Sequence, residues 1–238
     1  MNENRIQELL VLERAIDYRF SNPRLLDTAL THRSYVNENQ DCAVDDNERL
    51  EFLGDAVLQL CISDLLIRKF PNSPEGQLSK IRSSLVNEKP LAETAKRLSI
   101  GALLLLGRGE ELSGGRRKPS VLADAFEAVI AAIYTDGGYE TTRAIIERLF
   151  LSLVEDENSH LMDKDPKTLL QEYTMLAFRI MPRYDPLGDS GPDHDKIFRV
   201  RVSVGTTAAA VGQGKSKKEA EQEAAREALR VLGQGKDQ

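Results

Sequence analysis

The segment NERLEFLGD, residues 47–55, places three carboxylates among leucines and a phenylalanine. On an α-helix, which turns by about 100° per residue, Glu48, Glu51 and Asp55 fall within about 60° of one another. The apolar residues on the opposite side of this helix are Leu50, Leu53, Val57, Leu60 and Cys61. The segment therefore predicts a helix with one apolar face and a narrow stripe of acids.

A second segment, SVLADAFEAVIAAIY (120–134), has the same design. Asp124 and Glu127 are three residues apart, which puts them about 60° apart on a helix, and Ser120 is a suitable N-cap. The apolar far face holds Leu122, Phe126, Val129 and Ile133. Small residues flank the acids and are expected to leave room for an approaching group: Ala123, Ala128 and Ala131.

Carboxylates of like charge repel when they are neighbours on a helix, as Glu51 and Asp55 are. Two such helices that meet would form a cluster of four acids, Glu51, Asp55, Asp124 and Glu127. Hard oxygen ligands of this kind suit Mg²⁺ or Mn²⁺, and the chemistry they favour is metal-assisted hydrolysis of a phosphodiester. The alternative is that both acid pairs are solvated helix faces.

The composition is that of a globular protein of one or two domains. Of 238 residues, 41% are hydrophobic and 29% charged, and the net charge is −6, so a polyanion would need a local basic patch. Cys42 and Cys61 form no zinc motif. No signal peptide or membrane span is predicted, and a cytoplasmic location without membrane contact is expected.

The chain divides into two regions of different character. Residues 1–154 show apolar spacings of three and four, typical of helices; residues 155–163 are polar and predict a linker. Residues 164–234 predict a small α+β domain, with helices at 167–178 and 216–232 and strands at 196–205 and 206–214.

Three lysines stand at the start of the last helix, in GQGKSKKEAEQEAA (212–225). Ser216 and Glu219 form a capping box, so Lys215, Lys217 and Lys218 lie at the helix N-terminus, where positive charge is unfavourable. A docked anion would offset that cost. The alternative is a solvated lysine cluster.

These stretches closely resemble the bacterial ribonuclease III family, which cuts double-stranded RNA. NERLEFLGD matches the family's signature, and the surrounding motifs occur in family order: FSNPRLLDTALTHRSYVNE, FPNSPEGQLSKIRSSLVN, LGRGEELSGG and SVLADAFEAVIAAIYTDGG. DPKTLLQEY, GPDHDKIFRVRV and GQGKSKKEAEQEAA resemble the double-stranded-RNA-binding domain. The resemblance implies an all-α endonuclease domain (1–154) followed by an α-β-β-β-α RNA-binding domain (164–234).

The resemblance also implies roles for the acids. Glu51, Asp55, Asp124 and Glu127 match the family's metal ligands for Mg²⁺, with Mn²⁺ as a substitute, and Asp55 and Glu127 are expected to be catalytic. Supporting roles fall to Glu48, to Asn47 as an RNA-contacting or positioning residue, and to Glu75 near the dimer interface. His32 is expected to be structural, and no small-molecule cofactor is expected.

In the RNA-binding domain the resemblance assigns contacts to A-form RNA, which such domains recognise by shape over roughly 16 base pairs. Thr168, Gln171 and Glu172 match a minor-groove contact, His194 matches the contact to the next minor groove, and the three lysines match a phosphate clamp. From Asp163 onward there are 13 Lys and Arg and 12 Asp and Glu, which leaves 19 and 26 upstream. The negative excess therefore lies in the nuclease region.

The implied enzyme is a homodimer that hydrolyses structured RNA, ribosomal precursors included, to 5′-phosphate and 3′-hydroxyl ends with short 3′ overhangs. Phe52 lies near the acidic side of its helix, which favours a partner surface, unless it is buried within its own subunit. Two other hypotheses stay open: a non-catalytic RNA-binding protein on the same scaffold, and an acidic helical interaction protein.

Overall fold

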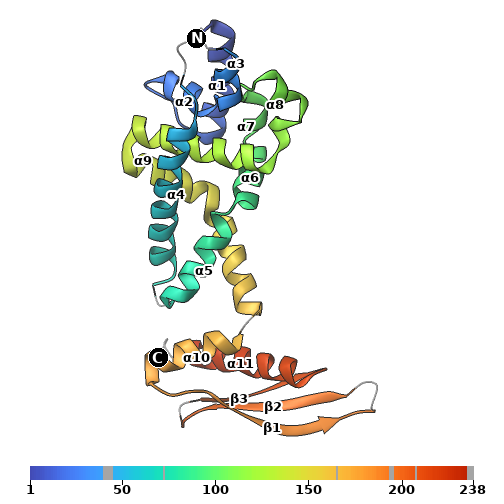
Figure 1. Ribbon diagram of the computed structural model, residues 1–238. Coiled ribbons are helices and arrows are strands. Elements are labelled where there is room, and N and C mark those ends of the chain that lie inside the picture. Colours follow the sequence, from blue (N-terminus) through green and yellow to red (C-terminus); the bar gives the residue numbers. More distant parts are fainter. Residues whose placement is uncertain (40–44, 72, 165, 193–195, 207, 235–238) are drawn as a thin grey trace. The chain divides into compact units, whose positions relative to one another are not determined.

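The computed structural model describes residues 1–39, 45–71, 73–164, 166–192, 196–206 and 208–234 (Figure 1). It divides into two compact units, residues 1–154 and 155–238. Within the described part of the chain, no helix is both long and apolar enough to cross a membrane.

The first unit is built from helices. They are α1 (Glu3–Ile16), α2 (Pro23–Ala29), α3 (Arg33–Glu38), α4 (Glu48–Lys69), α5 (Glu75–Leu85), α6 (Glu88–Arg97), α7 (Ile100–Leu103), α8 (Arg108–Leu112), the 3₁₀ helix η1 (Gly115–Arg117) and α9 (Pro119–Lys164), which continues past the end of this unit at residue 154. α9 is kinked at Gly138, whose φ of 75° lies in the left-handed region that glycine tolerates best. The all-α character predicted for this region is confirmed.

The core of the first unit forms around the first half of α9, which crosses α4 (Figure 1). Phe126 and Phe150 are fully buried and pack with ring centroids 6.1 Å apart. Ala128 and Ala131 are also fully buried, so the expectation that they leave room beside the acids is wrong. Small side chains there let neighbouring elements approach closely instead.

Two further expectations for these helices are corrected. Leu60, placed on the apolar face by periodicity, is 55% exposed, because α4 buries only the side on which Val57, Leu58 and Cys61 lie. Ser120 is not a cap: α9 begins one residue earlier, at Pro119. Proline suits the first position of a helix because its missing N–H has no partner there in any case.

The second unit has α10 (Pro166–Phe178), β1 (Arg183–Ser190), β2 (Ile197–Val204), β3 (Ala208–Gly214) and α11 (Lys217–Gln234). The strands form an antiparallel sheet in the order β1-β2-β3, and both helices cover one face of it (Figure 1). Leu170, Val202 and Ala224 are fully buried between them. The predicted α-β-β-β-α order is confirmed.

The sheet and α11 touch at a glycine. A Cβ atom on Gly212 would lie 2.1 Å from the backbone nitrogen of Ala224, so β3 and α11 meet backbone to backbone. The stripe of alanines along α11 serves this close packing. Residues 155–163, expected as a linker, continue helix α9.

Candidate metal centre and nucleic-acid interface

The two acidic segments meet at a close crossing of α4 and α9. A Cβ atom on Gly54 would lie 1.9 Å from the carbonyl oxygen of Glu127 and 3.1 Å from its Cα. A real side chain cannot occupy that space, so only glycine permits this approach. The crossing brings the helix turns that carry the acids next to each other.

Three carboxylates converge beside this crossing. Glu51, Asp124 and Glu127 each offer an oxygen, and these oxygens lie within 4.8 Å of one another on half-buried side chains. Three oxygen ligands from two rigid helices form the kind of site that holds a hard divalent cation.

The pKa values of all three acids are raised by their surroundings. Burial raises the pKa of Glu127 to about 8, and Asp55, Glu51 and Asp124 add to the rise. Burial, followed by the charge of Asp124, also raises the pKa of Glu51. The pKa of Asp124 is raised chiefly by burial as well. Desolvation and like charge both oppose ionisation, and a bound cation would relieve both.

Asp55 does not belong to this group of three. Both of its carboxylate oxygens accept hydrogen bonds from Nε2 of Gln59, one turn further along α4, at 2.7 and 2.9 Å. Among the neighbouring charges, that of Asp55 still contributes most to the raised pKa of Glu127. The structure therefore brings together three of the four predicted ligands and holds the fourth beside them.

The supporting residues take different positions. Asn47 is 3% exposed, and its side chain donates to the carbonyl oxygen of Ala29 at 3.3 Å, so its position suits a structural role and not an RNA contact. Glu48 is exposed and accepts from Arg33 at 2.9 Å. Asn47 thus connects the start of α4 to α2, and Glu48 connects it to α3.

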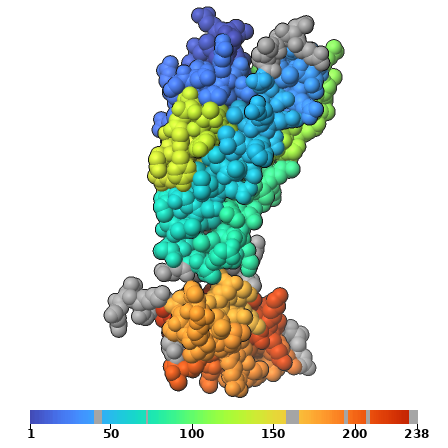
Figure 2. All heavy atoms as spheres, turned by 60° about the vertical axis from the view of Figure 1, so that its left-hand side comes forward, coloured from blue at the N-terminus to red at the C-terminus, as the bar shows by residue number. Residues whose placement is uncertain are grey.

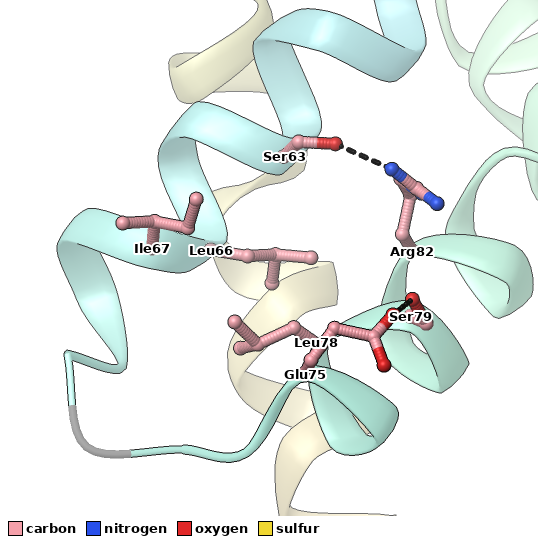
Figure 3. Close-up of a pocket in the computed structure, with 7 residues that line it drawn as sticks. All are labelled: Ser63, Leu66, Ile67, Glu75, Leu78, Ser79 and Arg82. Atoms are coloured by element: carbon pink, nitrogen blue, oxygen red, sulfur yellow. Dashed lines mark hydrogen bonds between the residues drawn. The ribbon is translucent and has the colours of Figure 1, made fainter.

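Glu75 begins α5 and accepts a hydrogen bond from the hydroxyl of Ser79 at 2.6 Å. It lines a pocket of about 150 Å³ between α4 and α5 (Figure 3). The other residues around this pocket are Ser63, Leu66, Ile67, Leu78, Ser79 and Arg82. None of the three converging acids lines it.

Residues near the site that sequence reasoning missed are Gly54 and Gln59. Gly54 precedes a predicted ligand directly, and Gln59 follows Asp55 at the helical spacing of four, so both signals were present. Ser34 contacts His32, which caps α3 through Nδ1 and lies outside any helix interior. The structural role expected for His32 agrees with this cap.

In the second unit, the basic cluster lies at the start of α11. Lys215, Lys217 and Lys218 are exposed. The Ser216 hydroxyl accepts from the backbone nitrogen of Glu219 at 3.2 Å, and the Glu219 carboxylate accepts from that of Lys215 at 2.8 Å. In the predicted capping box, the Glu219 carboxylate therefore binds the backbone. The side chains of the three lysines lie at the surface.

The remaining predicted RNA contacts lie mostly on α10. Gln171 is exposed, and Thr168 and Glu172 are half-buried. α10 is tied to α11 by an ion pair of 2.5 Å between Lys167 and Glu221, which joins the two predicted RNA-contacting helices. His194 lies outside the described residues.

Comparisons with known proteins agree with these two units. A family model described as Ribonuclease-III-like matches residues 22–153, and the double-stranded RNA binding motif matches residues 166–232. Ribonuclease 3 of Syntrophobacter fumaroxidans is 47% identical, with 94% of each chain covered. Ribonuclease 3 of Myxococcus xanthus is 45% identical over 95% of this chain and 87% of its own length.

A solved structure gives the same result for the first unit. The nuclease domain of ribonuclease III from Campylobacter jejuni, described as flexible in a region involved in dimer formation, matches with a TM-score of 0.55 and 44% identity. The match covers 60% of this chain and 95% of that one. With both units matched in order and nearly the whole length aligned, this chain belongs to the ribonuclease III family.

Proposed function

We propose that this chain cleaves double-stranded RNA by hydrolysis that depends on Mg²⁺, for which Mn²⁺ can substitute. The family and the two units of this chain are those of an endoribonuclease that acts on double-stranded RNA. The products would be 5′-phosphate and 3′-hydroxyl ends with short 3′ overhangs, and the substrates would include ribosomal RNA precursors. The observation that carries the proposal is the convergence of Glu51, Asp124 and Glu127.

The residues present suit a hard divalent cation. All three donors are carboxylates, their oxygens lie within 4.8 Å, and their ionised forms repel one another in a half-buried site. A divalent cation in such a site supplies Lewis-acid chemistry, which stabilises negative charge on phosphate oxygens and makes water more acidic. Nitrogen or sulfur ligands, which would favour other metals, are absent from this group of three.

The four acids then have separate tasks. Glu51, Asp124 and Glu127 would hold the cation through their carboxylate oxygens. Asp55, outside the group of three, would serve as a further ligand or orient the attacking water if its carboxylate turned away from the amide of Gln59. Asp55 and Glu127, which match the family's catalytic acids, are the residues whose loss should affect the chemical step most.

RNA recognition is assigned to the second unit. The exposed Lys215, Lys217 and Lys218 would contact phosphates across a major groove, and Thr168, Gln171 and Glu172 would meet a minor groove, with His194 at the next one. Such binding depends on A-form shape and is weakened by salt. It lets a chain of net charge −6 hold a polyanion.

We further propose a homodimer formed through α4. Phe52, Leu60 and Ile67 are 83%, 55% and 61% exposed and fall on one side of this helix. Figure 2 shows α4, coloured blue to cyan, at the surface along one face of the first unit. Large apolar side chains in a row on a surface indicate a contact site, and a two-fold contact would present two identical acid groups to two antiparallel strands.

The test is a duplex-cleavage assay with separate measurement of binding. Wild type should cut a 5′-labelled duplex only with Mg²⁺ or Mn²⁺. Asp55→Ala and Glu127→Ala should each lower the rate by about 100- to 1,000-fold, a loss typical of removing a principal transition-state contact, while duplex affinity in Ca²⁺ stays within about twofold. Binding without cutting by the wild type at saturating metal would instead identify a non-catalytic RNA-binding protein.

A further inference from the structure

The sheet of the second unit has a face that neither of its helices covers. Both helices pack on the other face (Figure 1), where Val200, Val202 and Val204 of β2 are buried. Successive side chains of a strand point to opposite faces, so the residues between these valines point away from the helices. Arg199 and Arg201 lie at such positions, and both are exposed. The outward face of the sheet therefore carries two arginines on its central strand.

Arg199 has no acid beside it on the sheet. Its neighbour in β1 is Gly188, which has no side chain, and its neighbour in β3 is Gln213, which is neutral. Gln213 is exposed while Gly212, the residue before it, is buried, so Gln213 shares the outward face with Arg199. The guanidinium of Arg199 is thus bordered by open space on one side and by an amide on the other.

Arg201 has one acid opposite it, and that acid is paired with another residue. Asp185 of β1 is in register with Arg201, but its carboxylate accepts from Nε of Arg183 at 3.0 Å. On the β3 side the neighbour is Val211, which is apolar and 40% exposed. Within the described residues, the side chains of Arg199 and Arg201 make no ion pair and no hydrogen bond.

The absence of an acid partner is notable in a chain with 38 acids and 32 bases. Several cations elsewhere in this unit are paired with acids: Lys167, Arg183, Lys196, Arg226 and Arg230. Arg199 and Arg201 are two residues apart, or about 6.6 Å along the strand, so their positive charges repel each other. A bound anion would offset this repulsion. The same condition applies to Lys217 and Lys218, the predicted phosphate contacts of α11.

We propose that Arg199 and Arg201 form a second phosphate-binding surface, which holds another segment of the RNA whose duplex the helices of this unit bind. A guanidinium matches the geometry of a phosphate and binds it through two N–H groups. The helices and the two arginines lie on opposite faces of the sheet, so one straight duplex cannot contact both. The inference goes beyond the proposed function and rests on it only in assigning the first duplex to the helices.

The occupant is assigned to RNA because the unit already binds this polyanion. Once the helices hold a duplex, the remaining phosphates of the same molecule are present at a high effective concentration, which lets a surface of only two cations contribute. Two sources of phosphate fit this surface, a single-stranded extension of the bound RNA or a second helical segment of it.

The test compares three RNAs on the full chain in Ca²⁺. They are a blunt duplex of about 16 base pairs, the length that such domains span, the same duplex with a single-stranded extension, and the same duplex joined by a flexible linker to a second hairpin. At about 100 mM salt the wild type should bind at least one of the longer RNAs about tenfold more tightly than the blunt duplex, since each phosphate contact contributes a slope of about 0.7 to 0.9 in log affinity against log salt.

Arg199→Ala combined with Arg201→Ala should remove this gain. The double variant should bind all three RNAs alike, within about twofold of the wild-type affinity for the blunt duplex, and its salt slope for the longer RNA should fall by about 1 to 2. Its thermal midpoint should stay within about 2 °C of the wild type, because exposed side chains without partners contribute little to stability.

Two matched variants serve as controls. Arg199→Lys combined with Arg201→Lys keeps both charges and should keep the salt slope of the wild type. Lys89→Ala combined with Lys96→Ala makes the same change of net charge on α6 and should keep the full gain. The longer RNA that binds more tightly identifies the source of the phosphates.

Three outcomes would overturn the inference. An equal gain in the wild type and in the arginine-to-alanine variant would assign the extra contacts to another surface. No gain from either longer RNA would exclude RNA as the occupant and leave an acidic protein as the candidate. Weaker binding of the blunt duplex by the arginine-to-alanine variant would show that the arginines contact the first duplex. Loss of cleavage alone would contradict only the proposed function, since every measurement here is of binding.

Discussion

Gly54 in α4 lies against the backbone of Glu127 in α9, so that a Cβ atom at Gly54 would come within 1.9 Å of the Glu127 carbonyl oxygen. This contact sets the spacing of the two helices at the point where both carry acids. Glu51 lies almost one turn before the glycine, and Asp124 almost one turn before Glu127. The convergence of the three carboxylates therefore depends on the absence of one methyl group.

Gly54→Ala should push α4 and α9 apart. We expect the free energy of unfolding to fall by about 1–3 kcal/mol, as for other overpacked cores, and Mn²⁺ affinity to fall because the carboxylates separate. Chemical denaturation and calorimetry measure the two effects. Gly109→Ala is the matched control, because nothing lies within 4 Å of a Cβ atom at Gly109. Equal effects in both variants would contradict a special role for the crossing.

The stability of the cation-free protein should depend on pH through Glu127. Its folded pKa of about 8 exceeds the ordinary value of 4.5, so between these values the folded state binds the extra proton and stability falls as pH rises. Glu127→Gln should remove this slope and be more stable than the wild type at pH 8.5 in EDTA. Denaturation curves at pH 5, 7 and 8.5 measure it, and parallel pH profiles for the two proteins would refute the assignment.

Gln59 should restrain Asp55. Replacing it with leucine removes both hydrogen bonds to the carboxylate and frees Asp55 to turn toward the cation. A charge-assisted hydrogen bond contributes about 1.5 kcal/mol or more, so we expect Mn²⁺ affinity to rise by about tenfold or more. The same change in an Asp55→Ala background is the control and should have no effect. A fall in affinity for the single variant would show that Gln59 supports the site.

The lysines of α11 should account for much of the salt dependence of RNA binding. Lys217→Ala combined with Lys218→Ala should weaken duplex binding and reduce the slope of log affinity against log salt by about 1 to 2, one phosphate contact for each lysine. Filter binding from 50 to 300 mM salt measures the slope. Lys89→Ala with Lys96→Ala makes the same change of net charge on α6, and a similar loss of slope there would argue against a local clamp.

Self-association should depend on Phe52. If α4 forms the dimer contact, Phe52→Ala should weaken the dimer by at least about 30-fold, the effect of losing a central aromatic anchor of 2 kcal/mol or more. Sedimentation equilibrium measures the dissociation constant. Leu112→Ala is a suitable control, because Leu112 is 80% exposed but lies on α8. A wild type that is monomeric at micromolar concentration would exclude the proposed dimer.

Local pattern was enough to identify most of the chemistry. The spacing of Glu51, Asp124 and Glu127 among apolar residues predicted acids on one side of two helices, because the helical period fixes which side chains share a face. The same rule, with the capping box at Ser216, located α11 to within two residues at each end. These features depend on neighbours in the chain, and so they can be recognised without coordinates.

Features that depend on how helices meet could not be obtained in this way. Periodicity assigned Leu60 to the core and led to the expectation that Ala128 leaves room for an approaching group, since it defines the faces of a helix but not which face a neighbour covers. It grouped Asp55 with the other acids because it does not show that Gln59 holds the carboxylate aside. Whether acids on separate helices share one cation depends on the distance between the helix axes, and here the packing of Gly54 against Glu127 sets that distance.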